Sequence, residues 1–140
     1  MTELEIKMLK DINNSYNADG IENTEFYNLY AGQEITKQLR GTFTSLKRKK
    51  IVSHYNDPDC FNPIYPTRKF IEIMQELNET VSDEIISSVR FDEFYTEYGT
   101  EYNEWIEENN MYNWKDETSG KVYWKYPFNK WLKETYNLDC

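Results

Sequence analysis

The chain has 140 residues, enough for one domain with a hydrophobic core or for two very small ones. Aromatic residues make up 16% of it, which argues against a disordered tail, and no apolar run approaches the ~18 residues of a membrane span. The two cysteines, Cys60 and Cys140, do not fit the count or spacing of a structural disulfide or a zinc site. The N-terminus has no secretory signature, so we expect a cytoplasmic protein.

The formal charge of −9 is unevenly distributed along the chain. Residues 1–70 hold ten Lys/Arg against nine Asp/Glu, whereas residues 71–140 hold six against sixteen. The cations of the near-neutral half cluster in "KRKK" at residues 47–50, where they can form a local basic patch. We therefore expect the two halves to have different electrostatic roles.

Two helices are predicted before residue 31. The first covers residues 2–13, because Thr2 and Glu5 have capping-box spacing and an apolar residue recurs every third position at Ile6, Leu9 and Ile12. The turn formers in "NNSYNADG" should end it. A short second helix is expected over residues 23–30, followed by a turn at Ala31-Gly32.

The clearest helical signal lies within residues 33–52. Apolar residues at spacings of four, four and three predict one buried face, made of Ile35, Leu39, Phe43 and Leu46. Thr36 can cap the first turn, and the helix dipole favours the cations at the C-terminal end. The residues expected to face outward are Lys37, Gln38, Arg40, Thr44 and Ser45. Gly41 costs such a helix about 1 kcal/mol, which indicates either a tight crossing of another helix or contact with a backbone outside the protein.

The stretch "ITKQLRGTFTSLKRKKIV" resembles the recognition helix and first wing strand of a winged helix-turn-helix domain. The resemblance implies a mainly α fold with a small β-hairpin wing (α+β) over residues 1–78, and binding of double-stranded DNA through the major groove. Some winged helices serve only as protein contacts, and that alternative stays open. The resemblance implies base-edge contacts from Lys37, Gln38, Arg40 and Thr44, and phosphate contacts from Lys47, Arg48, Lys49 and Lys50.

The wing is expected after this helix. "KIVSHYN" and "NPIYPTRKF" predict two strands, joined by a turn at "DPDCF". His54 is the only histidine, and we interpret it as a strand residue without a catalytic role because partners for it are missing. A fourth helix is predicted from a cap at Thr67 to about Leu77. Arg68 and Lys69 at its start are expected to be solvated.

Residues 79–140 are predicted to form an acidic, aromatic-rich helical region with a hairpin at 111–126. One or two helices are expected between residues 82 and 110, with Gly99 as the break, one aromatic face and one negative face. The negative face is either a solvated surface or a partner-binding surface made of Glu93, Glu97, Glu101, Glu104, Glu107 and Glu108. The last helix opens at Pro127 and either packs on its own domain or pairs with a second copy in a homodimer.

The sequence shows no catalytic constellation, phosphate-binding glycine loop or metal-ligand spacing, so we expect neither an enzyme nor a cofactor. The first hypothesis is a non-enzymatic DNA-binding regulator of the winged-helix type, encoded by a phage or mobile element. The alternative is a phage counter-defence inhibitor of the anti-CRISPR or anti-restriction kind, which blocks a host nuclease by protein contact or DNA mimicry. That second resemblance is one of general character and rests on no motif. Either protein would act in the bacterial host cytoplasm, without a membrane partner.

Overall fold

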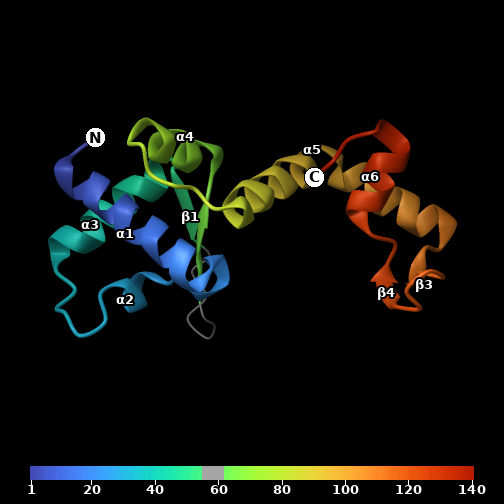
Figure 1. The fold of residues 1–140 in the computed structure, drawn as a ribbon, viewed down its shortest axis with the longest axis horizontal. Helices are drawn as coiled ribbons and strands as arrows, with labels where there is room; N and C mark the ends of the chain where they lie inside the picture. Colours follow the sequence, from blue (N-terminus) through green and yellow to red (C-terminus); the bar gives the residue numbers. More distant parts are fainter. Residues whose placement is uncertain (55–61) are drawn as a thin grey trace. The chain divides into compact units, whose positions relative to one another are not determined.

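A computed structural model describes residues 1–54 and 62–140. The fold is mainly helical with two small antiparallel hairpins, which confirms the predicted α+β class (Figure 1). The chain divides into two compact units, Met1–Val89 and Arg90–Cys140. The predicted boundary after residue 78 therefore falls inside the first unit. No helix in the described part of the chain combines the length and apolar character that crossing a bilayer requires.

Helix α1 (Glu3–Asp19) begins with the predicted capping box, in which Thr2 and Glu5 each accept a hydrogen bond from the other's backbone N–H. The predicted end near residue 13 was wrong, since the helix continues to Asp19 and stops at Gly20, whose φ is +85°. Tyr16 explains the extra turns. Its ring is buried on the face of α1 that continues the apolar stripe, and its hydroxyl donates to the Ile64 carbonyl at 2.6 Å. This burial outweighs the weak helix propensity of the neighbouring asparagines.

The segment predicted as one helix over residues 23–30 is split into a 3-10 turn, η1 (Ile21–Asn23), and a short helix, α2 (Phe26–Leu29). Between them the chain is extended because its backbone pairs with a distant segment. The Ile64 N–H donates to the Thr24 carbonyl at 2.8 Å, and Glu25 forms an isolated bridge with Pro63. Long-range pairing therefore overrides the local helical pattern in these residues.

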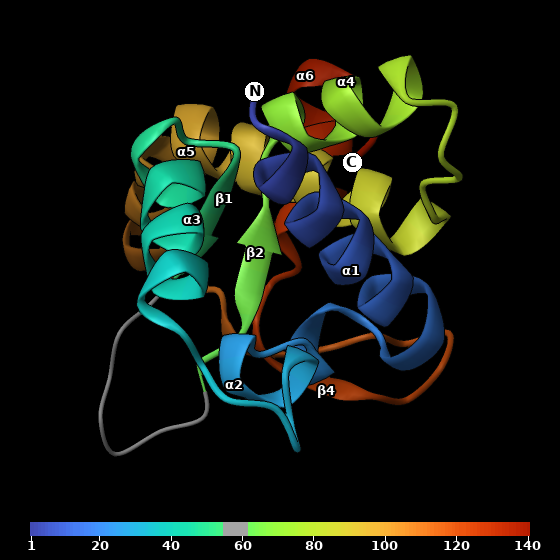
Figure 2. The same ribbon diagram turned by 90° about the vertical axis from the view of Figure 1, so that its left-hand side faces the viewer.

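Helix α3 (Lys37–Arg48) has the predicted cap, with the Thr36 hydroxyl accepting from the Leu39 N–H at 3.1 Å. It leads into β1 (Val52–His54), which pairs antiparallel with β2 (Ile64–Pro66). Both strands are shorter than predicted, and the predicted turn at residues 57–61 lies outside the described residues. Figure 2 shows α1 and α3 toward the viewer with β2 visible between them.

Helix α4 (Arg68–Glu76) follows β2. Thr67 occupies its N-cap position but makes no side-chain cap, contrary to the prediction. Its hydroxyl instead donates to the backbone carbonyls of Lys50 and Ile51, each at 2.7 Å, and so joins the start of α4 to the segment before β1. On the other side of α4, Phe70, Ile71 and Met74 are buried as part of the core.

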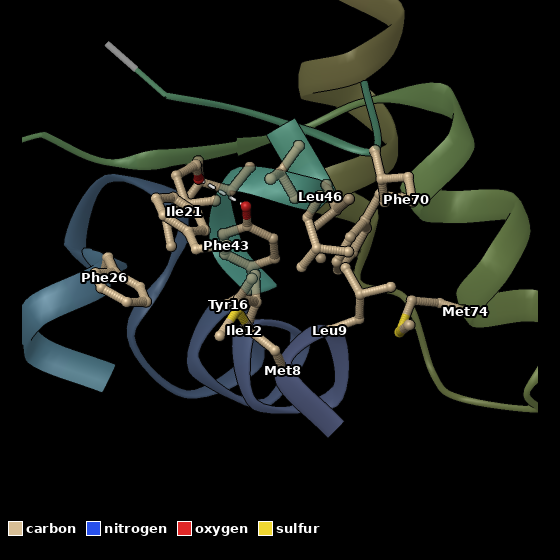
Figure 3. Close-up of a cluster of buried hydrophobic side chains, with 14 of the residues drawn as sticks. Met8, Leu9, Ile12, Tyr16, Ile21, Phe26, Phe43, Leu46, Phe70 and Met74 are labelled. Carbon is tan, nitrogen blue, oxygen red and sulfur yellow. Dashed lines mark hydrogen bonds between the residues drawn. The ribbon is translucent and has the colours of Figure 1, made fainter. Parts of the chain in front are cut away.

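The core of the first unit joins α1, α3, β2 and α4. Figure 3 shows Leu9, Ile12 and Tyr16 of α1 beside Leu46 of α3 and Phe70 of α4. The first turns of α5 (Asp83–Asn109) also bury Ile85 and Val89 in this core. This packing explains why the first unit extends to Val89, beyond the boundary inferred from composition.

The second unit contains the rest of α5, the predicted hairpin of β3 (Tyr112–Lys115) and β4 (Val122–Lys125), and α6 (Phe128–Tyr136). Helix α5 is continuous, so Gly99 is not a break; the Tyr95 ring covers it, 3.0 Å from where a Cβ would lie. The apolar stripe of α6 packs within this unit. The second core consists of Tyr102, Ile106, Tyr126, Phe128, Trp131 and Leu132.

Candidate nucleic-acid interface

The outward face of α3 carries cations and no carboxylate. Phe43 and Leu46 are buried and Leu39 is half-buried, so the opposite side of the helix is turned to solvent. We define the α3 ridge as the exposed residues that share this side, about 16 Å long at 1.5 Å per residue: Lys37, Arg40, Gly41, Thr44 and Arg48. Gln38 is also exposed, at the flank of the ridge.

Gly41 lies in open space. A Cβ built at this position would have no heavy atom within 4 Å, so the first explanation for this glycine, a tight crossing of helices inside the protein, is wrong. Its neighbours on the ridge are the cations Lys37 and Arg40 and the hydroxyl of Thr44. The glycine therefore leaves the α3 backbone accessible at the middle of a positively charged surface.

A shallow cavity of about 200 Å³ adjoins the ridge, with one wall made by Arg40, Thr44 and Lys47. The other lining residues are Phe26, Tyr27, Phe43 and His54. Lys47 is half-buried, and its ammonium lies 4.7 Å from the centre of the Phe43 ring. The sequence analysis missed Tyr27, which is 61% exposed although the neighbouring Phe26 is buried. The sequence feature that could have identified Tyr27 is its position outside the apolar stripe of a short helix, where a tyrosine is expected to be exposed.

His54 adds no positive charge to this cavity at neutral pH. Burial lowers its pKa from the usual 6.5, and the nearby Lys47 ammonium lowers it further. Its ring contacts Phe43 edge to face, with the ring centres 5.2 Å apart. The cationic character of the cavity therefore comes from Arg40 and Lys47.

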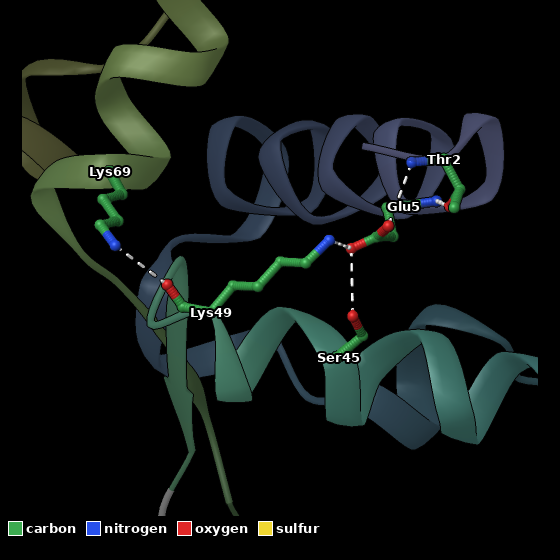
Figure 4. A network of polar contacts seen from close by, with 5 residues as sticks. All are labelled: Thr2, Glu5, Ser45, Lys49 and Lys69. Carbon is green, nitrogen blue, oxygen red and sulfur yellow. Dashed lines mark hydrogen bonds and ion pairs between the residues drawn. The ribbon is translucent and has the colours of Figure 1, made fainter.

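Lys49 and Ser45 are held by α1 (Figure 4). The Lys49 ammonium lies 2.7 Å from an oxygen of the buried Glu5 carboxylate, and the Ser45 hydroxyl donates to the same oxygen at 3.3 Å. Ser45, expected to face outward, is thus half-buried. Because the Glu5 charge is matched by that of Lys49, we leave Lys49 out of the surface available to a partner.

The C-terminal end of α3 is closed by a left-handed residue. Lys50 has a φ of +59°, and the Ile51 N–H reaches back to the Leu46 carbonyl at 3.1 Å, a Schellman-type end. Arg68 and Lys69 are exposed as predicted, and the Lys69 ammonium also donates to the Lys49 carbonyl at 3.3 Å. Arg48 and Lys50 remain exposed beside this turn, where they extend the positive surface of the ridge.

The predicted acidic residues lie on the exposed side of α5, and Glu101, Glu104 and Glu108 adjoin Trp105 and Trp131 at its edge. We define the acidic stripe by five residues at spacings of four, four, three and four, which share one side of the helix: Glu93, Glu97, Glu101, Glu104 and Glu108. Glu107 lies at its flank. In the described part of the chain, Glu97, Glu101 and Glu104 form no ion pair with a lysine or arginine. Glu101 accepts a hydrogen bond from the Tyr136 hydroxyl.

Similarity to known proteins gives no assignment for these surfaces. Comparisons with protein families, curated proteins and solved structures found no match to this chain. Among the described residues, no group of His, Cys, Asp and Glu side chains is arranged to hold a metal ion. A function has to be inferred from the α3 ridge, the cavity beside it and the acidic stripe.

Replacing Glu5 with glutamine should destabilise the first unit and remove part of its acid sensitivity. The Lys49 ammonium, followed by the Thr2 N–H, lowers the pKa of Glu5 from 4.5 to about 2. A depressed pKa contributes stability above pH 4.5 that is lost as the pH falls toward 2. We expect a loss on the order of 2 kcal/mol at pH 7 and little difference from wild type near pH 2.

The measurement is urea unfolding followed by the NMR amide signals of α1 and α3, because all four tryptophans lie in the second unit. The matched control is Glu79→Gln, which breaks the surface pair of Glu79 with Lys10 and should cost under about 0.5 kcal/mol. An equal loss for Glu5→Gln at pH 7 and near pH 2 would contradict the assigned role of Lys49.

Replacing Gly41 with alanine should stabilise the first unit by about 0.5–1 kcal/mol. The added methyl group meets no neighbour and the helix loses a residue of poor propensity. The same urea experiment measures the gain. Unchanged or reduced stability would show that this part of α3 is more constrained than its open surroundings indicate.

Proposed function

We propose that residues 1–89 form a DNA-binding module of the winged helix-turn-helix type and that the protein is a non-enzymatic regulator. The observation that carries the proposal is the α3 ridge. Residues 1–89 hold ten Lys/Arg against fourteen Asp/Glu, yet the twelve residues of α3 contain four cations and no carboxylate. A concentration of positive charge in an otherwise negative unit is the electrostatic footprint of polyanion binding.

The arrangement around α3 supports the same proposal. Three helices precede the antiparallel β1–β2 pair, and the Thr24 to Ile64 hydrogen bond ties that pair to the segment ahead of α2. The β1–β2 pair is thus attached to the helical core where a wing is expected. Residues 55–61, which connect the two strands, lie outside the described part of the chain.

An α-helix of this kind fits the ~12 Å major groove of B-DNA. With the α3 ridge turned into the groove, base edges are contacted by Lys37, Gln38, Arg40 and Thr44. The phosphates lie near Lys47, Arg48 and Lys50. Gly41 has a defined role here, because the absence of a side chain lets a sugar–phosphate backbone or a base edge approach the helix closely. The cavity between Tyr27 and Lys47 extends this surface beyond the helix itself.

The test measures binding to duplex DNA by fluorescence anisotropy across a range of salt concentrations. Arg40→Ala with Arg48→Ala should weaken binding at least about tenfold and make the slope of log affinity against log salt shallower by about 0.9 for each phosphate no longer neutralised. The matched control is Lys7→Ala with Lys10→Ala, which removes two lysines from α1 and should have a small effect. No duplex binding by the wild-type protein at low salt would end this proposal.

A second function is favoured by the acidic stripe. Five carboxylates cover fifteen residue steps of α5, or about 22 Å of helix, and they lie on its exposed side, where a basic protein surface can approach them. Their mean spacing of about 5.6 Å is closer to the 3.4 Å of a single DNA strand than to the ~1.7 Å of a duplex. We propose as the alternative that the stripe binds a nucleic-acid-binding host protein such as a nuclease, as a phage counter-defence inhibitor would.

Charge reversal separates the alternative from the first proposal. The experiment measures DNA cleavage by a CRISPR nuclease and by a restriction nuclease in the presence of increasing amounts of this protein. Glu97→Lys with Glu104→Lys should abolish inhibition, whereas Arg40→Ala with Arg48→Ala should retain it, because the substituted residues lie in different units. Equal inhibition by the wild-type and charge-reversed proteins would rule out the stripe as the inhibitory surface.

A further inference from the structure

One face of the β3–β4 hairpin is unusually apolar for an exposed surface. Trp124 is 71% exposed and Val122 is 59% exposed. The register pairs Val122 with Lys115, so these two side chains lie on the same face of the hairpin, as does Trp124 two residues further along β4. The other three tryptophans, Trp105, Trp114 and Trp131, are half-buried or buried. An uncovered tryptophan in this setting indicates a contact surface, since tryptophan is enriched at binding hot spots.

Lysines surround this face. The Lys125 ammonium lies 4.9 Å from the centre of the Trp124 ring, and Lys121 lies next to Val122 with its ammonium over Tyr123. We define the hairpin face as the exposed residues that share this side of the hairpin or adjoin it at the turn: Lys115, Lys121, Val122 and Trp124. Lys125 is half-buried on the other side of β4, where its ammonium also donates to the Asn103 side-chain oxygen at 3.1 Å. The hairpin face is therefore suited to a partner with carboxylates or phosphates.

The second unit is electrically divided. Residues 90–109 hold seven Asp/Glu against one Arg, whereas residues 110–133 hold five Lys against two Asp/Glu. The two exposed surfaces, the acidic stripe and the hairpin face, thus have opposite charge. The core contacts within the unit are made by the aromatic side of α5, as in the packing of Trp105 on Tyr126 with ring centres 5.3 Å apart.

We propose that the hairpin face binds the acidic stripe of a second copy of the chain. A second copy is a suitable partner because each copy carries a positively charged hairpin face and a negatively charged stripe, which are complementary. In a two-fold dimer each hairpin face meets the other copy's stripe, so the contact is made twice and the arrangement is closed. Trp124 supplies the apolar anchor and the lysines set the orientation against the carboxylates. This inference does not depend on DNA or nuclease binding.

Sedimentation velocity of the nuclease-treated full-length protein tests the proposal. We expect concentration-dependent dimers between about 1 and 100 µM at low salt, weakened at ~0.5 M salt because the Debye length falls. Trp124→Ala should raise the dimer dissociation constant at least about tenfold. The matched control is Tyr27→Ala, which removes an aromatic side chain of similar exposure, 61% against 71%, from the first unit and should leave association of the nuclease-treated protein unchanged.

A charge-exchange pair identifies the two surfaces. Lys115→Glu with Lys121→Glu gives a chain with two negative surfaces. Glu97→Lys with Glu104→Lys and Glu108→Lys gives one with two positive surfaces, because the formal charge of the five stripe positions changes from −5 to +1. Each variant alone should be monomeric, and an equimolar mixture should sediment as a dimer, because both contacts in the mixed dimer are complementary. Near-ultraviolet circular dichroism checks that each variant is folded.

The proposal would be overturned if the wild-type protein were monomeric at all concentrations, or if Trp124→Ala dimerised as tightly as the wild type. It would also be overturned if either charge variant dimerised alone, or if the mixture of the two stayed monomeric. Association that appears only when nucleic acid is added back, and that Trp124→Ala abolishes while Arg40→Ala with Arg48→Ala does not, would assign the hairpin face to a polyanion instead of a second copy.

Discussion

The attachment of α3 to α1 is the constraint on which the candidate interface depends. Leu46 and Phe43 bury one side of α3 in the core that α1 supplies with Leu9 and Ile12, and this burial turns the opposite side outward. The Glu5 to Lys49 pair fixes the C-terminal end of the helix from the same side. Apolar burial supplies most of the stability and sets the rotation of α3, and the ion pair adds a second attachment at the C-terminal end of the helix. The ridge is exposed as a consequence.

Elements with a strong local signal were predictable. The Thr36 cap, the apolar stripe of α3 and the aromatic hairpin needed only short-range patterns. The errors occurred where distant residues decide the local structure. Tyr16 lengthens α1 by bonding Ile64, and Ile64 in turn holds Thr24 extended where a helix was expected. Neither contact leaves a periodic trace in the sequence, so residue spacing could not have shown them.

The candidate site shows the same division. Periodicity placed Lys37, Arg40 and Thr44 on one face correctly, since the helix itself determines that relation. It could not show that Lys49 is engaged by Glu5, forty-four positions away, or that Tyr27 adjoins Arg40 and Lys47 across a cavity. The formal charge of −9 was also a poor guide, because charges of opposite sign are separated by surface in both units. The local sign of the charge on each face decides which partners it can accept.

The acidic stripe can serve only one partner at a time. Self-association through the hairpin face and capture of a basic host protein require the same carboxylates, so the two proposed complexes compete. By linkage, self-association weakens binding of the host protein, and binding of the host protein weakens self-association by the same free energy. Dilution dissociates the dimer and releases chains whose stripe can bind the host protein.

The α3 ridge belongs to a different set of residues from the stripe. A dimer formed through the second units therefore contains two copies of the ridge. Two linked sites bind a long polyanion more tightly than either alone when their separation matches the lattice of phosphates. The affinity for duplex DNA should therefore rise with protein concentration when the chains can dimerise through the stripe. An excess of a protein that binds the stripe prevents dimerisation and should remove this dependence.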